Sequence, residues 1–316
     1  MKNNENKMKK KFSPFYTVLC VLIAFYSITI IAAIYFMFVT AFKTQLEWDL
    51  NHWFIPGAAK GSDGFTFENL TQIFTSYYKE RGYGKTPIYL AEMAMNSVVY
   101  SIGSSFFAAL VPCVMAYFSA KFDYKFSGVI YATVIAVMII PVVGSMPATI
   151  KMLKTTGLYN KMISAFVLKG TFVSMYFLVF YAAFKGVPKD YTEAAYIDGA
   201  SELRIMVNVI MPLVKTTFLT VFLIFFVDFW NDYQTPVIYI PAKQTLAGYI
   251  RSLSTGGSNI WMWNEATQKF DASLNQKLFV GVEMAGCFII AAPTLTIFCV
   301  FRNRLMGNLS MGGIKG

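Results

Sequence analysis

Three ionisable residues interrupt apolar stretches of the sequence that are long enough to cross a membrane. They are Lys169, Asp228 and Glu283, and all three fall in the outer half of their stretches. Charged groups at such positions are costly, so they usually face a partner or a water-filled cavity. Asp228 and Glu283 therefore indicate a polar translocation cavity or a structural pairing. Lys169 indicates such a cavity or a side chain that extends to the membrane interface.

An aromatic and amide cluster follows Asp228, in the order Trp230-Asn231-Asp232-Tyr233. Aromatic rings stack on sugar faces and amides hydrogen-bond to hydroxyl groups, so Trp230 and Asn231 would suit a carbohydrate. An aromatic belt at the membrane interface explains the rings equally well. The sequence leaves both interpretations open.

A polar segment, Tyr191 to Leu213, lies between two apolar runs. Ala195 and Gly199 are four residues apart and would leave one helix face nearly bare, which lets another protein approach the backbone. Glu193 and Asp198 add charge beside that face. Glycine costs about 1 kcal/mol relative to alanine inside a helix, so Gly199 indicates a turn or a close contact. The alternative is an amphipathic helix lying in the membrane interface.

Other kinds of chemistry find no support in the residues. All four cysteines fall in apolar runs, and the single histidine, His52, has no cysteine near it, so neither a disulfide framework nor a metal site is predicted. Gly84-Lys85-Thr86 resembles the end of a phosphate-binding loop, but Lys79 occupies the required glycine position. No catalytic residue, cofactor site or metal site is expected.

The elements that position these residues are apolar helices. The chain is 56% hydrophobic and 14% charged, against about a quarter charged in soluble domains. Its net charge of +10 is therefore attributed to basic ends at a membrane surface, with no nucleic-acid partner. About 20 helical residues cross a bilayer, which predicts an all-α integral membrane protein with six transmembrane helices at residues 15–42, 96–120, 126–150, 162–184, 216–235 and 278–301.

The distribution of lysine and arginine predicts the orientation. Five lysines within the first 14 residues place the N-terminus in the cytoplasm, and six spans return the C-terminus to the same side. The predicted organisation is a cytoplasmic basic N-terminus (1–14), a first span (15–42), an extracytoplasmic loop (43–95), a core of five spans (96–301) and a cytoplasmic tail (302–316). Within the core, residues 185–215 are cytoplasmic and residues 236–277 are extracytoplasmic.

The polar segment carries a family pattern. Glu193-Ala194-Ala195, three residues, Gly199, nine residues and Val209-Ile210-Met211-Pro212 resemble the EAA loop of binding-protein-dependent ABC importer permeases. That pattern ends in I-x-L-P, so Val209 and Met211 are mild apolar departures. The D-G-A continuation after the EAA residues, the W-N-D-Y cluster, Ala292-Pro293 and the glycine-rich tail 312–316 resemble the carbohydrate branch, of the maltose-importer type. The resemblance covers roughly residue 96 to the C-terminus.

The resemblance implies a type I ABC importer permease fold with a cytoplasmic coupling helix, in a bacterial cell membrane. It implies three kinds of protein partner: a second permease subunit of the maltose-importer type, two ATPase subunits that bind the ATP, and an extracytoplasmic solute-binding protein. The substrate implied is a carbohydrate, and the surrounding partner is membrane lipid. The coupling residues implied are Glu193, Ala194, Ala195, Asp198, Gly199 and Pro212. In this family the coupling helix inserts into a groove on the ATPase. The loop before the last span, here within 254–265, is expected to probe the binding protein, and residues 312–316 to reach between the ATPases.

Three rival functions remain. A permease of the same type for another solute, such as a peptide, shares every feature of the coupling segment. An ion-coupled secondary transporter would use Asp228 and Glu283 as a proton relay, but it leaves the EAA pattern unexplained and needs an inverted repeat, of which no sign is visible. A membrane enzyme would need a catalytic set that the sequence lacks.

Overall fold

The computed structural model describes residues 14–57, 64–78, 87–122, 127–140, 144–255, 260–264, 269–271 and 280–309. The basic N-terminal segment, the glycine-rich tail 312–316 and residues 256–259 of the predicted probing loop lie outside this set. The described residues fall into two compact units. The first comprises residues up to 71 and 279–288, and the second comprises residues 72–278 and those from 289 onward.

Four helical stretches among the described residues are long and apolar enough to cross a membrane. They are α1 (Pro14–Ala41), α4 (Leu90–Lys121), the continuous stretch Glu202–Trp230, and Val280–Arg302 within α14 (Val280–Leu309). Most of α1 is exposed in the isolated chain. Because α1 is apolar on all sides, its surface must be covered by lipid or by other subunits. The prediction of a helical, multi-pass membrane protein is confirmed.

In each of the other two predicted spans, the structure contains two shorter helices in place of one long helix. Residues 126–150 contain α5 (Ser127–Ile139) and α6 (Met146–Thr155), and residues 162–184 contain α7 (Met162–Lys169) and α8 (Met175–Lys185). Helix α6 begins with a proline in its first turn, after Gly144, which has a positive φ of 77°. Gly170 ends α7. Glycine and proline favour such interruptions, but hydropathy alone does not register them.

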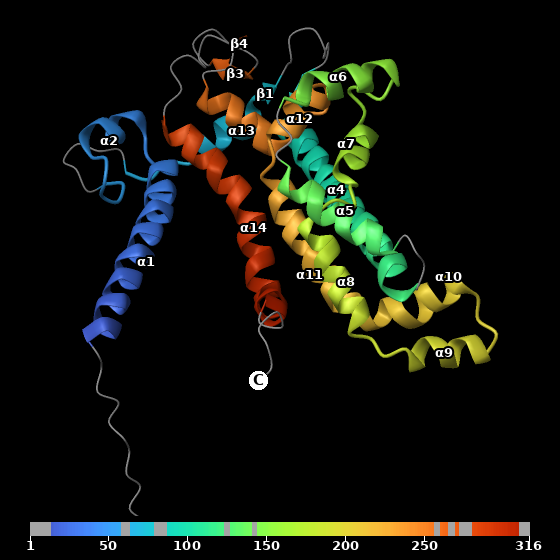
Figure 1. Cartoon of the computed structure of the whole chain (residues 1–316). Coiled ribbons are helices and arrows are strands. Elements are labelled where there is room, and N and C mark those ends of the chain that lie inside the picture. The colour runs from blue at the N-terminus through green and yellow to red at the C-terminus, as the bar shows by residue number, and fades with distance from the viewer. Residues whose placement is uncertain are drawn as a thin grey trace, which may run out of the picture. The chain divides into compact units, whose positions relative to one another are not determined.

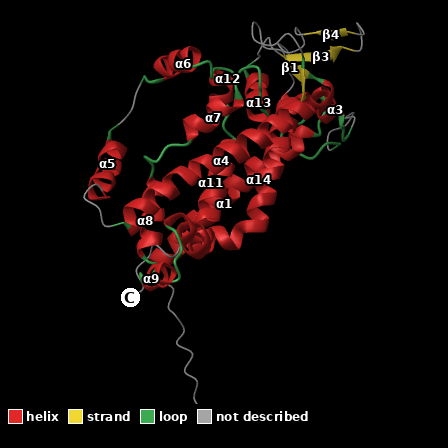
Figure 2. Cartoon of the chain, turned by 90° about the vertical axis from the view of Figure 1, so that its right-hand side faces the viewer, coloured by secondary structure: helices red, strands yellow, loops and turns green. Residues whose placement is uncertain are grey.

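The core of the second unit lies between α4, α8 and α11 (Met211–Trp230), which run side by side in both views (Figures 1 and 2). Helix α8 supplies three fully buried rings, Phe177, Phe180 and Phe184. Helix α4 supplies small side chains, and its stripe of Ser101, Ser105 and Ala109 is fully buried. Large residues on one helix therefore fill the space that small residues leave on the other.

Helix α7 packs on α4 through a glycine. A Cβ atom at Gly103 would lie only 2.4 Å from ring atoms of Phe166, so a larger residue there would displace the ring. The ring of Phe166 also stacks on Phe107, with centroids 5.9 Å apart. Gly103 thus sets the distance between α4 and α7.

A small sheet and two short helices lie at the α6 end of the second unit, beyond the purely helical fold that was expected (Figure 1). The strands are β1 (Tyr77–Tyr78), β2 (Ile88–Tyr89), β3 (Ile260–Asn264) and β4 (Lys269–Asp271), paired antiparallel in the order β2-β1-β3-β4. Helices α12 (Gln234–Tyr239) and α13 (Leu246–Ser254) lie between α11 and β3 in the sequence. The Asn96 amide of α4 donates to the Gln244 carbonyl (3.1 Å), which anchors the start of α13 to the bundle.

The first unit contains α1, α2 (Gln45–Leu50), the beginning of α3 (Glu68–Thr75) and the first residues of α14. Phe38 and Phe42 of the α1 end contact the ring of Phe288. The Asn69 amide donates to the carbonyls of Ala41 (2.9 Å) and Lys43 (2.7 Å), closing the chain that follows α1.

Candidate functional site

The predicted coupling segment forms a short helix followed by a long one. Helix α9 (Asp190–Ile197) lies beside the end of α8, and both views show this arrangement (Figures 1 and 2). After a turn at residues 198–201 come α10 (Glu202–Arg204), the π-helical turn η1 (Ile205–Ile210) and α11, without a break. One turn thus joins α9 to a helical stretch of 29 residues, Glu202–Trp230.

Gly199 ends α9 and does not lie on its face. The Gly199 N–H donates to the Tyr196 carbonyl (3.0 Å) and the Ala200 N–H donates to the Ala195 carbonyl (3.0 Å), which is the Schellman arrangement of a helix C-terminus. Gly199 has a φ of +76°, which side-chain-bearing residues adopt only with strain. The expected bare face shared by Ala195 and Gly199 is therefore wrong, whereas the alternative of a turn at Gly199 is confirmed.

The sides of α9 have different surroundings. Ala195 is half-buried and packs, together with Ala200, against the core between α4, α8 and α11. Asp190, Ala194 and Ile197, at positions i, i+4 and i+7, form an exposed side that we call the open side. Ile197 is 86% exposed, the highest value of any large apolar residue described. Sequence reasoning named Ala194 but missed Ile197, whose type alone gives no hint of its exposure.

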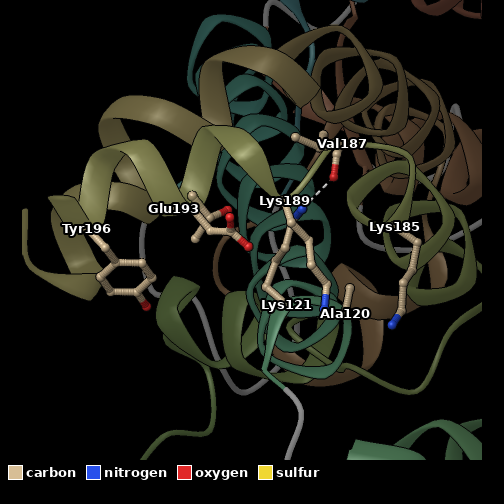
Figure 3. Close-up of a pocket in the computed structure, with 8 residues that line it drawn as sticks. Ala120, Lys121, Lys185, Val187, Lys189, Glu193 and Tyr196 are labelled. Atoms are coloured by element: carbon tan, nitrogen blue, oxygen red, sulfur yellow. Dashed lines mark hydrogen bonds between the residues drawn. The ribbon is translucent and has the colours of Figure 1, made fainter.

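Glu193 belongs to a third side of α9, which lines a pocket. The pocket measures about 200 Å³ and lies between α9 and the ends of α4 and α8. Its lining residues are Ala120, Lys121, Lys185, Val187, Lys189, Thr192, Glu193 and Tyr196. Figure 3 shows the Glu193 side chain between Tyr196 and the lysines. Asp198 caps the end of α9 and is exposed.

Pro212 lies in the first turn of α11, within the continuous helical stretch Glu202–Trp230. Proline has no N–H to donate and its ring collides with the carbonyl four residues earlier. The preceding residues respond by widening into η1, where the Met211 N–H donates to the Met206 carbonyl, five residues back. The helix thus passes through Pro212, and residues 203–210 before it belong to the same apolar helical stretch.

At the other end of α11, Asp232 accepts hydrogen bonds from several groups. Its Oδ2 atom lies 2.8 Å from Lys169 Nζ, 2.7 Å from the Tyr100 hydroxyl and 2.7 Å from the Thr235 hydroxyl. The Lys169 ammonium also lies 4.7 Å from the centre of the Phe229 ring. Lys169 therefore has a partner within the chain.

Electrostatics at Asp232 favour the ionised form. Burial alone would raise the pKa of the Asp232 carboxyl. The Lys169 charge, together with hydrogen bonds from Lys169, Thr235 and Tyr100, outweighs burial and holds the pKa below its ordinary value. The sequence analysis named Asp232 only as a member of the aromatic and amide cluster. Its partner Lys169 lies 63 positions earlier in the sequence, so no local pattern indicated the pair.

The pathway candidates have unequal surroundings. Asp228 is exposed on α11 and forms no salt bridge with any residue that the structure describes. Trp230 is 6% exposed, stacks on Phe226 and donates to the Ile290 carbonyl (3.0 Å), so its ring is closed to a ligand in this conformation. Asn231 is exposed and donates to the Val227 carbonyl (2.8 Å). Glu283 is half-buried in the first turn of α14, within the first unit.

Comparisons with known proteins agree with this architecture. Residues 87–311 match the model of the family described as binding-protein-dependent transport system inner membrane component. The diacetylchitobiose uptake system permease protein NgcG of Streptomyces coelicolor is 24% identical, over 93% of this chain and 87% of its own. The probable starch degradation products transport system permease protein AmyC of Thermoanaerobacterium thermosulfurigenes is 24% identical, over 90% and 92%.

A solved structure has the same fold. It is a crystal structure of a bacterial ABC transporter involved in the import of the acidic polysaccharide alginate, one chain of which aligns with a TM-score of 0.68 at 15% identity. The alignment covers 92% of this chain and 95% of that one. Because the family match extends over most of the sequence, the chain belongs to the binding-protein-dependent transport system inner membrane components, the permease subunits of ABC importers.

Proposed function

We propose that this chain forms half of the translocation pathway of an ATP-driven importer for a sugar or oligosaccharide. The observation that carries the proposal is α9, a short helix that exposes Ile197 on its open side and continues through one turn into the spanning stretch Glu202–Trp230. A helix so placed can receive a force at the membrane surface and pass it to the bundle. The printed names of the relatives, which include diacetylchitobiose and starch-product permeases, support carbohydrate as the solute class.

The open side of α9 is the surface proposed to enter a groove of an ATPase subunit. Ile197 supplies an apolar side chain that a groove would remove from water, and burial of such a side chain contributes about 1.5–3 kcal/mol. Ala194 beside it permits close approach. Asp198, at the end of the helix, is available to donors on the ATPase. Ala195 then packs α9 against the core between α4, α8 and α11, and the exposed carboxylate of Glu193 is also available to the ATPase.

The remaining parts of the proposal concern partners and orientation. ATP is bound and hydrolysed by two partner ATPase subunits, and this chain needs no cofactor of its own. A second permease completes the pathway, and an extracytoplasmic binding protein delivers the solute. Helix α9 and both termini lie on the cytoplasmic side, which the lysine-rich N-terminal sequence supports. Asp228, exposed on α11, is the candidate lining residue in this chain.

The direct test is a pull-down in which the purified permease subunits, with Ile197→Asp in this chain, capture the partner ATPase. Loss of apolar burial and introduction of a charge that the groove must desolvate should weaken capture at least about tenfold, corresponding to about 1.4 kcal/mol. Met152→Asp is the matched control, because Met152 is also exposed but lies on α6, at the opposite end of the bundle. Equal capture by both variants would rule out the open side as the docking surface.

The solute class needs its own experiment. The proposed extracytoplasmic binding protein should be screened against mono- and oligosaccharides, peptides and amino acids by calorimetry. Uptake of the best ligand should then require this chain and ATP. Selective binding of a peptide would leave the coupling proposal standing and replace the sugar, whereas uptake driven by an ion gradient without the ATPase would refute the importer itself.

A further inference from the structure

The pocket beside α9 contains three lysines and one carboxylate, a formal excess of two positive charges. Lys121 comes from the last turn of α4, Lys185 from the last turn of α8, and Lys189 precedes α9. The carboxylate is that of Glu193. Lys185 and Lys189 place two like charges near the Lys121 ammonium. An anion in the pocket would relieve that repulsion.

The chain's own contacts hold two of the lysines in place. The Lys121 ammonium donates to the Val187 carbonyl at 2.7 Å, and this bond is visible in Figure 3. The Lys185 ammonium lies 5.7 Å from the centre of the Tyr181 ring. Because these contacts orient the side chains before any ligand arrives, an anion that binds here meets a prepared site.

The size and position of the pocket indicate which anion fits. Pockets for small molecules usually measure about 300–1,000 Å³, so 200 Å³ suits a compact group such as a phosphate. The pocket lies where two apolar helices end, and Phe118, one turn before Lys121, is 42% exposed. Sites that bind anionic lipid headgroups between spanning helices have the same arrangement: basic residues hold the headgroup, and the apolar helix surface next to them contacts the acyl chains.

We propose that Lys121, Lys185 and Lys189 bind the phosphate of an anionic phospholipid whose acyl chains lie along the α4 surface near Phe118. The bound lipid would hold the ends of α4 and α8 to the side of α9 that carries Thr192, Glu193 and Tyr196. Glu193 limits the affinity by placing one negative charge among the lysines. This inference goes beyond the proposed function and does not depend on which solute is transported.

The test is titration of the purified full chain, in neutral detergent, with fluorescent phosphatidylglycerol and phosphatidylcholine. Phosphatidylglycerol should bind more tightly. Replacing all three lysines by glutamine should weaken its binding roughly 100-fold, since each basic residue near a lipid surface contributes about 1 kcal/mol, or about fivefold. Each single replacement should weaken it about fivefold, which keeps the test decisive if the triple variant fails to fold. Glu193→Gln should tighten it.

A matched triple variant controls for overall charge. Lys151→Gln, Lys154→Gln and Lys161→Gln remove three exposed lysines outside the pocket and should change binding less than twofold. Equal losses in the two triple variants, or no loss in either, would overturn the proposal. So would equally tight binding of soluble glycerol 3-phosphate, which would assign the site to a free phosphate. Unchanged lipid selectivity together with lost ATPase capture would assign the lysines to an acidic surface of the ATPase instead.

Discussion

The Lys169 ammonium lies 2.8 Å from Oδ2 of Asp232 and ties the end of α7 to the turn that follows α11. Both side chains are largely withdrawn from solvent, with exposures of 25% and 15%. Asp232 also accepts from the Thr235 N–H (3.1 Å), so the same carboxylate fixes the start of α12. One acidic residue thus joins three elements near the end of the bundle opposite α9.

Asp232→Asn should destabilise the chain by about 1.5–3 kcal/mol, because it removes charge-assisted hydrogen bonds and leaves the Lys169 ammonium without its counterion. Thermal unfolding of the purified chain in detergent measures the effect. Asn231→Ala is the control, since Asn231 is exposed and bonds only to its own helix; it should cost about 0.5 kcal/mol or less. Equal midpoints for Asp232→Asn and the wild type would show that the ion pair adds nothing.

The same pair predicts a dependence of stability on pH. The pKa of Asp232 is lower in the folded chain than in the unfolded chain. Its contribution is therefore present above the unfolded pKa of about 3.9 and is lost as the pH falls through the folded value. The difference in unfolding midpoint between wild type and Asp232→Asn should stay constant from pH 5 to 8 and shrink below about pH 4. A difference that shrinks between pH 5 and 8 would contradict this assignment.

Substitutions at Gly199 should act through backbone strain. Alanine at a φ of +76° costs about 1–2 kcal/mol, while asparagine tolerates that region better. Among the residues that the structure describes, no atom lies within 4 Å of a Cβ at this position, so the size of the side chain should matter little to folding of the subunit. Gly199→Trp should therefore unfold at about the same temperature as Gly199→Ala, with Gly199→Asn closer to wild type.

ATPase capture by the same three variants separates strain from contact. If Gly199 faces the ATPase in the complex, Gly199→Trp should lose capture while Gly199→Ala largely keeps it. Identical capture by the alanine and tryptophan variants would confine the role of this glycine to ending α9.

Asp228→Asn and Glu283→Gln test the translocation candidates. If the two acids line the pathway, each replacement should reduce uptake severalfold, while the subunit still assembles and the complex keeps its basal ATPase rate. Uptake by vesicles and ATPase activity of the same preparation are the measurements. Loss of assembly would instead assign the acids to structural pairing, and wild-type uptake would remove them from the pathway.

The sequence alone was sufficient for the class of protein, the helical spans of greatest length and the family pattern. The reason is physical: a bilayer sets a minimum length for an apolar helix, and this requirement is visible in one dimension. The spacing from Glu193 to Pro212 is likewise local. It indicated a helix and left a turn or a close contact as the two explanations of Gly199, and the structure contains the helix and the turn.

Only the tertiary structure decided which residues meet. Lys169 lies in a predicted span that the structure divides, and its partner is Asp232, which sequence reasoning passed over in favour of Asp228. The helical period showed that α9 has different sides, but not that Ala195 faces the core while Ile197 faces outward. Which side is covered depends on α4 and α8, whose residues are distant in sequence and adjacent only after folding. Exposure and ion pairing are properties of those packed neighbours, so no local pattern could have specified them.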